Sequence, residues 1–131
     1  MITIEIKTNN KQKFYNITHK INSLIKEKNI KNGIATVFVP HTTAGITISE
    51  NADPDVLTDL YYTFDKIYPN RPEYKHIEGN SDAHAKSIAV GPSLTCIINN
   101  GSLALGIWQS IYFCEFDGPR TRKIYIKFIE G

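Results

Sequence analysis

The sequence predicts a single α+β domain over residues 1–131, with a mostly antiparallel, β-sandwich-like core of about seven strands, two main helices and one short helix. Three observations support this prediction. Apolar residues alternate with polar ones near both ends of the chain, as they do in half-buried strands. Two longer segments between them place apolar residues on one helical face. Asn99-Asn100-Gly101 separates two short apolar runs, as a hairpin turn does.

The first fifty residues are expected to form four strands and one helix. Thr18 is a candidate N-cap for this helix, because its hydroxyl can accept a backbone hydrogen bond. Gly33 is expected to end the helix, because glycine adopts the left-handed conformation of a C-cap. Pro40 cannot donate to a strand ladder and should stop the third strand, which is apolar enough to be central. The four strands are expected at residues 2–6, 14–17, 34–39 and 43–49.

The second helix has the strongest start signal in the chain. Asp53-Pro54 combines an acceptor side chain at the N-cap with a fixed φ at the first helical position. Apolar residues then share one helical face until Pro69 begins a loop that runs to about Ser81. A short helix should follow from Asp82 to Val90. The remaining chain is expected to be strand, at residues 94–98, 108–116 and 122–129, with a short run at 103–105.

Composition argues against several classes of protein. A formal net charge of +2 without a dense basic run argues against binding to nucleic acid. No apolar run is long enough to span a bilayer, and no secretory signal is visible at the N-terminus. Cys96 and Cys114 lie in predicted strands and are expected to be buried free thiols of a reducing cytosol. The sequence therefore predicts a cytoplasmic protein without nucleic-acid or membrane partners.

Polar residues gather in three blocks that a fold would not need for stability alone. The first block, Pro40–Pro54, contains His41 at its start and Glu50 near its end. The second covers residues 80–84, and the third covers residues 117–120. We expect the three blocks to converge on one site.

Histidines in and beside these blocks suggest a metal site. His41, His76 and His84, with nearby carboxylates, could provide an open catalytic site with three protein ligands and a water. Histidine ligation favours Zn²⁺, whereas carboxylates would suit Mg²⁺. Their spacing matches no diagnostic motif, so His41 and His84 could instead be hydrogen-bonding partners, with His76 solvated. Glu50 could be a site residue or a surface carboxylate.

Arg120 and Arg122 are candidates for binding an anion. Residues two apart on a strand share a face, so these arginines could clamp a carboxylate or a phosphate. Glu115 and Asp117 also share a face and could neutralise the arginines instead.

Trp108 and Gln109 open one of the longest predicted strands. Trp108 is expected to be buried in the core or in a subunit interface. The amide of Gln109 needs a partner if it is buried, so this residue could position a ligand or a neighbouring subunit.

The polar blocks, in this order, resemble the YjbQ family, also called the secondary thiamine-phosphate synthase family. The resemblance covers the chain from about Ile34 to the C-terminus. Ser49, Ile97 and Ile107 depart from the usual family residues, and the loop between His76 and Asp82 is short. The matching motifs are residues 41–44 (HTTA), 50–54 (ENADP), 82–84 (DAH) with Lys86, 91–94 (GPSL), 106–109 (GIWQ) and 115–120 (EFDGPR).

The resemblance implies a compact fold assembled as a homotrimer, with a polar pocket near the subunit interface that binds a divalent metal or an anion. The implied activity joins a pyrimidine pyrophosphate to a thiazole phosphate and releases pyrophosphate, so the substrates are small phosphorylated metabolites. The alternative is a non-catalytic homotrimer that binds a metal or an anion. The expected catalytic residues are His41, Glu50, Asp82 and His84. The expected substrate-binding residues are Thr42, Thr43, Asn51, Lys86, Gln109, Arg120 and Arg122.

Overall fold

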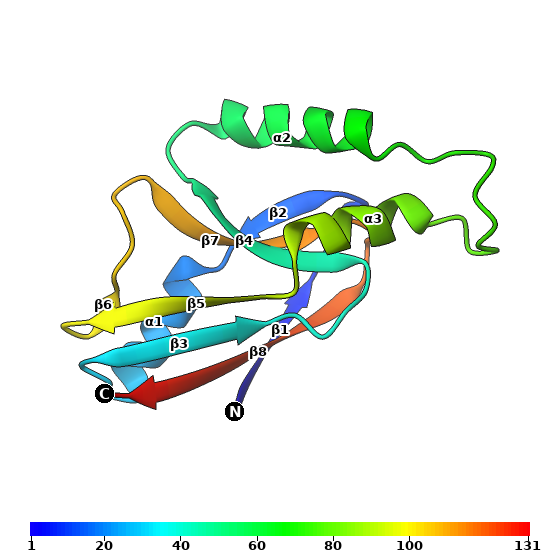
Figure 1. The fold of residues 1–131 in the computed structure, drawn as a ribbon. Coiled ribbons are helices and arrows are strands. Elements are labelled where there is room, and N and C mark those ends of the chain that lie inside the picture. Colours follow the sequence, from blue (N-terminus) through cyan, green and yellow to red (C-terminus); the bar gives the residue numbers. More distant parts are fainter.

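The computed structural model describes residues 1–131 and contains eight strands and three helices (Figure 1). In chain order the elements are β1 (Ile2–Lys7), β2 (Lys13–Asn16), α1 (Thr18–Glu27), β3 (Gly33–Phe38), β4 (Ala44–Glu50), α2 (Pro54–Ile67), α3 (Ser81–Val90), β5 (Ser93–Asn99), β6 (Ser102–Leu103), β7 (Gln109–Glu115) and β8 (Thr121–Glu130). The predicted α+β class is confirmed. The strands number eight rather than about seven, and α3 is as long as α1, at 10 residues each.

The strands form two sheets in which every pairing is antiparallel. The larger sheet has the order β1-β8-β3-β5-β6, and the smaller has the order β2-β7-β4. As predicted, β3 is interior, with Val37 opposite Leu94 on β5 and Ile126 on β8. The predicted hairpin turn joins β5 to β6, where Asn100 and Gly101 both have the positive φ that a type I′ turn requires.

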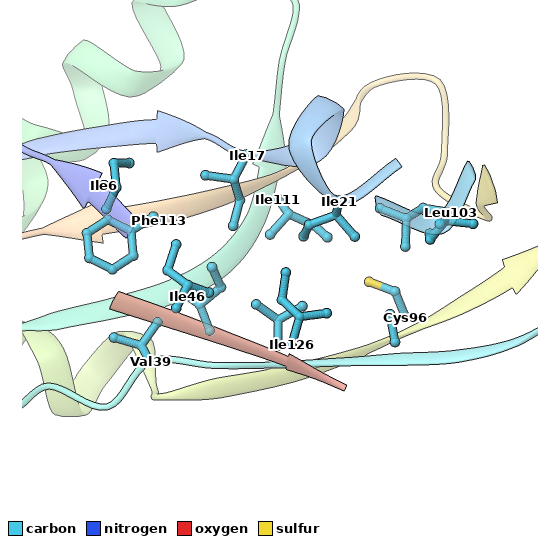
Figure 2. Close-up of a cluster of buried hydrophobic side chains, with 14 of the residues drawn as sticks. Ile6, Ile17, Ile21, Val39, Ile46, Cys96, Leu103, Ile111, Phe113 and Ile126 are labelled. Carbon is cyan, nitrogen blue, oxygen red and sulfur yellow. The ribbon is translucent and has the colours of Figure 1, made fainter. Parts of the chain in front are cut away.

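The main hydrophobic core lies between the two sheets, and α1 closes one end of it (Figure 2). Ile126 contributes from the larger sheet, Phe113 from the smaller sheet and Ile21 from α1. Because side chains alternate along a strand, the neighbours of Phe113 on β7 point to the opposite face. Cys96 is in this core; it and Cys114 are buried free thiols, as predicted.

A second core covers the other face of the smaller sheet, beneath α2 and α3 (Figure 1). Phe14 packs edge-on against Tyr61 of α2, with ring centroids 5.1 Å apart, and the Tyr61 hydroxyl accepts a hydrogen bond from the Phe14 backbone. Asp53 caps α2 as predicted, because its Oδ1 accepts from the backbone of Asp55 at 2.9 Å. The strand β7 is therefore enclosed by a core on each side.

Two local predictions about α1 are wrong. Gly33 does not end this helix, because α1 ends at Glu27 and Gly33 is the first residue of β3. Thr18 is the first residue of α1 rather than its cap, and its hydroxyl accepts a hydrogen bond from the backbone of Ile111 on β7. Of the two places predicted for Trp108, the core is excluded, since this residue lies in the turn before β7 and is 60% exposed, and a subunit interface stays a prediction. No helix of the structure has the length and apolar character needed to cross a membrane.

The position of α3 depends on a close approach to β4. A Cβ atom at Gly45 would lie 2.8 Å from the carbonyl oxygen of Gly91, so only glycine allows this packing. The same carbonyl accepts a hydrogen bond from Ile46, and the Ser87 hydroxyl donates to Ala44 at 2.7 Å. These contacts hold α3, which carries His84, against the start of β4.

Candidate functional site

A polar cavity of about 320 Å³ lies where the segment before β4 meets α3 and the start of β8. It brings together parts of all three polar blocks of the sequence, including His41 and His84. Thr42 and Thr43 also line it, as expected for substrate-binding residues. None of its lining residues is hydrophobic; they are Pro40, His41, Thr42, Thr43, Glu78, Asn80, His84, Arg120 and Arg122.

Arg122 is held in the cavity wall by a buried carboxylate. Glu115 is fully buried and accepts hydrogen bonds from Nε and Nη2 of Arg122, from the Thr8 hydroxyl and from the backbone of Asp117. Arg122 Nη2 also donates to Oγ1 of Thr43 at 2.8 Å. A buried ion pair requires such complete pairing, because an unpaired buried charge costs several kcal/mol. Only Nη1 of Arg122 has no partner within the chain.

Arg120 is paired in a similar way but lies at the rim. Its Nη2 donates to Oδ2 of Asp117 at 2.9 Å, and its Nε donates to the carbonyl oxygen of the same residue. Asn80 donates to Oδ2 of Asp117 as well, at 2.8 Å. Burial alone would raise the pKa of Asp117, but the hydrogen bonds from Asn80 and Arg120 outweigh it and lower this pKa. The acids thus neutralise both arginines, which line the cavity, yet Nη1 of each guanidinium makes no hydrogen bond within the chain.

Asn80 lines the cavity and has an unpartnered acceptor atom that is itself buried. It is buried, and its Oδ1 has no hydrogen-bond partner in the chain. Asn80 belongs to the second polar block but had no predicted role of its own, although an asparagine directly before a helix is usually taken as an N-cap. Its side chain makes no cap and turns to Asp117 instead. Finding this role required knowing that residues 80 and 117 are neighbours in space.

His41 is held as a neutral ring. The backbone N–H of Lys123 donates to Nε2 of His41 at 2.9 Å, so the neutral imidazole carries its proton on Nδ1. Burial, followed by the positive charge of Arg122, lowers the pKa of His41. His41 therefore offers the cavity a hydrogen-bond donor at neutral pH, while its lone pair is already occupied.

His84 is the more available of the two imidazoles. Its ring makes no hydrogen bond within the chain and meets the ring of His76 edge-on, with centroids 5.6 Å apart. His76 is exposed and does not line the cavity. The structure contains no group of three or more His, Cys, Asp or Glu side chains placed to hold a metal ion. One chain therefore does not assemble the predicted three-histidine site.

The second half of the first block lies far from the cavity. β4 has seven residues and a strand rises about 3.3 Å per residue, so Glu50 is about 20 Å from Ala44. Gln109 pairs with Glu50 at this far end. Asn51 donates to the carbonyl oxygen of Gln109, whose own side chain accepts from Gly106. Within one chain, these predicted site residues stabilise the strand ends and do not reach the cavity.

Asp82 and Lys86 are also outside the cavity, although they are on the same helix as His84. Residues two apart on a helix point in different directions, so both side chains face away from His84. Lys86 is buried, and its Nζ donates to Asp65 at 2.6 Å and to Gln12 at 2.8 Å. The side chain of Asp82 is also buried. Its Oδ1 has no hydrogen-bond partner, and its Oδ2 lies 3.9 Å from the ammonium group of Lys11. Lys86 thus links α3 to α2 through an ion pair and does not serve as an anion ligand of the cavity.

Comparison with known proteins supports the resemblance found in the sequence. The family model described as "UPF0047 protein YjbQ-like" matches residues 2–131. UPF0047 protein YugU of Bacillus subtilis is 52% identical over 128 residues, which cover 97% of each chain. UPF0047 protein YjbQ of Salmonella typhimurium is 36% identical over 110 residues, or 79% of this chain and 78% of that protein.

Solved structures agree with these sequence matches. A crystal structure of a YjbQ/UPF0047 family protein from Clostridium acetobutylicum is 51% identical, with a TM-score of 0.95, and the match covers 98% of this chain and 100% of that one. A conserved protein from Thermus thermophilus is 38% identical with a TM-score of 0.92, over 98% of this chain and 100% of that one. The chain therefore belongs to the YjbQ-like UPF0047 family.

Proposed function

We propose that the chain binds small phosphorylated metabolites in the polar cavity and acts on them as an enzyme. The observation that carries this proposal is the convergence of two guanidinium and two imidazole groups on one cavity without hydrophobic lining. The reaction that the family resemblance suggests is the joining of a pyrimidine pyrophosphate to a thiazole phosphate, with release of pyrophosphate. Its substrates carry several phosphate oxygens, which are the groups that guanidinium donors bind best.

Arg120 and Arg122 would bind phosphate in different ways. Arg122 is fixed by Glu115 and Thr43, so its guanidinium needs no rearrangement in the cavity wall before a ligand arrives. Arg120 is about half exposed and can adjust its position at the rim. Donors that are fixed in advance stabilise charge at little reorganisation cost, which is how enzymes stabilise developing charge.

The two imidazoles would serve the reacting end of the substrate. A departing pyrophosphate takes the electron pair of the broken bond, so negative charge grows on its oxygen. Nδ1–H of His41 can donate a hydrogen bond to that oxygen, and His84 has both ring nitrogens available for proton transfer. Thr42 at the cavity wall adds a hydroxyl.

A divalent ion, Zn²⁺ or Mg²⁺, stays a prediction. Within one chain the cavity supplies only one unengaged imidazole, because the lone pair of His41 is occupied by the backbone of Lys123 and His76 lies outside. The donor set of the single chain does not fit a three-ligand site, so no step of the proposed reaction is assigned to a metal. Metal analysis of the purified protein and of His84→Ala tests this prediction.

Pyrophosphate binding, followed by calorimetry, tests the proposed site. Arg120→Ala should weaken binding about 10- to 100-fold, because a hydrogen bond to a charged group contributes about 1.5–3 kcal/mol. Gln109→Ala is the matched control at the far end of β4 and should bind like wild type. Wild-type protein that fails to bind pyrophosphate, or Arg120→Ala that binds it equally well, would contradict the proposal.

Turnover separates an enzyme from a binding protein. Thiamine phosphate should form from the two substrates with wild-type protein, and His84→Ala should abolish its formation while pyrophosphate still binds. If the wild type binds pyrophosphate but forms no product, the non-catalytic anion-binding protein becomes the better proposal.

Self-association as a homotrimer is part of both alternatives. The feature that favours it is an exposed apolar pair beside β7, in which Ile107 and Trp108 have no covering element. Soluble proteins usually bury a tryptophan or use it in an interface. A Trp108→Ser variant should shift the protein toward monomer in light scattering, whereas an unchanged mass would exclude this surface from the assembly.

A further inference from the structure

A separate cavity lies beneath α2, between this helix, β4 and the end of α3 (Figure 1). Its volume is about 280 Å³, and it shares no lining residue with the polar cavity. We call it the α2 cavity. Its walls include Phe14 on β2, Thr47 and Ser49 on β4, Leu60 and Phe64 on α2, and Val90 on α3.

The helix α2 is held over the smaller sheet without being packed tightly against it. No residue of α2 is buried, although its apolar face lies over the second core. Two polar contacts fix the helix in this position. The Tyr61 hydroxyl accepts a hydrogen bond from the backbone of Phe14 at 3.0 Å, and Asp65 accepts one from Lys86 at 2.6 Å. These contacts keep the space beneath the helix open before any ligand arrives.

Two hydroxyl groups line this cavity, on a face of β4 that would be apolar in a closed core. Thr47 and Ser49 alternate along β4 with Ile46 and Ile48, which pack into the main core on the opposite face. Neither hydroxyl makes a hydrogen bond within the chain. Unused hydroxyls among apolar walls are typical of a ligand cavity, in which a few polar groups orient a mostly apolar molecule.

The lining of the α2 cavity indicates the chemistry of its ligand. Six of its eight lining residues are hydrophobic and none is charged, so a charged group inside it would lose water without gaining a counter-charge. Phe14 and Phe64 meet edge to face, with ring centroids 6.1 Å apart, and a further aromatic ring can extend this arrangement. An apolar cavity of about 150 Å³ can hold benzene, so the space is sufficient for one substituted ring.

We propose that the α2 cavity binds a small neutral aromatic molecule whose hydroxyl or carbonyl group forms a hydrogen bond with Thr47 or Ser49. The ring of the ligand then lies against Phe14 and Phe64, and Leu60 covers it from α2. The proposal is independent of the proposed function, because the two cavities have no residue in common.

Ligand titrations followed by NMR test this proposal, with phenol and toluene as probes that differ in a polar hydroxyl and an apolar methyl group. Wild-type protein should bind both, whereas benzoate, which is charged at neutral pH, should not bind. The double substitution Thr47→Val and Ser49→Ala removes both hydroxyls from the cavity. This variant should bind phenol about 10-fold more weakly and toluene no less tightly, because only phenol loses a hydrogen-bond partner.

Two further variants locate the bound ring. Ala89→Phe fills the cavity from the exposed end of α3 and should abolish binding of both probes. Thr95→Val is the matched control, because Thr95 is exposed on β5 outside the cavity, and it should bind both probes like wild type.

Failure of the wild type to bind either probe would overturn the proposal, and so would unchanged binding in Ala89→Phe. An unchanged ratio of the two affinities in the double variant would overturn the role given to the hydroxyls. Benzoate that binds as tightly as phenol would overturn the requirement for a neutral ligand.

Discussion

The two ends of β4 both carry polar residues, but the hydrogen bonds of these residues differ between the two ends. At the start of the strand, Thr43 joins a buried network with Arg122 and Glu115. At the other end, Asn51 and Gln109 bond mainly to the nearby backbone in an exposed position. In the sequence the two ends belong to one continuous polar block.

This difference indicates which polar residues are candidates for function. Hydrogen bonds that complete a strand end need only near neighbours and leave no group free. The network at the start of β4 draws on distant segments and buries an ion pair at considerable desolvation cost, and its arginine lines a cavity. Burial of charge without an evident gain in stability is typical of functional sites.

The largest expected effect is a loss of stability when a buried charge is removed at the cavity end of β4, compared with an exposed charge at the far end. Glu115→Gln should lower the free energy of unfolding by about 3 kcal/mol, because it leaves the buried Arg122 without a counter-charge. Glu50→Gln is the same substitution at the far end and should change stability by less than about 0.5 kcal/mol. Urea unfolding measures both. Similar losses for the two variants would remove the proposed difference.

A second test compares glycines near the two ends. Gly45→Ala should destabilise the protein by about 1–3 kcal/mol, because its Cβ would meet the backbone of Gly91 and the Val90 side chain. At Gly106 a Cβ would meet only the flexible side chain of Gln109, so Gly106→Ala should cost less than about 1 kcal/mol. Thermal unfolding of the pair measures the contrast. Loss of pyrophosphate binding in Gly45→Ala alone would further show that α3 positions the cavity.

The smallest expected effect is a dependence of stability on pH. It should arise from His41 at the cavity end of β4. Burial and Arg122 lower the pKa of His41 in the folded protein, so the unfolded chain binds this proton more readily. Stability should therefore fall as the pH drops below about 6.5, the usual pKa of histidine in an unfolded chain. His41→Gln keeps an acceptor for Lys123 but cannot be protonated, so its stability should fall less on acidification. Parallel curves for the two proteins would contradict this prediction.

Local chemistry made most of the fold predictable. The cap formed by Asp53, the turn at Asn100-Gly101 and the alternation along β8 each depend on neighbouring residues, which the sequence states directly. Thr18 was misassigned because its hydroxyl bonds to β7, a strand that is distant in the sequence.

The candidate site was predicted less completely, for geometric reasons. The separation of His41 from Glu50 along an extended strand, and the angle between His84 and Lys86 on a helix, could both have been derived from standard element geometry. The role of Asn80 could not, because it depends on its contact with Asp117. The convergence of His41 with His84 was inferred only from the similar character of the blocks.

The enclosure of β7 by a core on each face has a consequence for how the molecule responds to a ligand. Phe113 supports one core and Cys114 the other, so β7 can leave the sheet only when both cores are disrupted. Amide protons of β7 should therefore exchange with solvent only when the whole molecule unfolds. Glu115 ends this strand and holds Arg122, so tight binding of phosphate would slow exchange throughout both cores and not only around the bound anion.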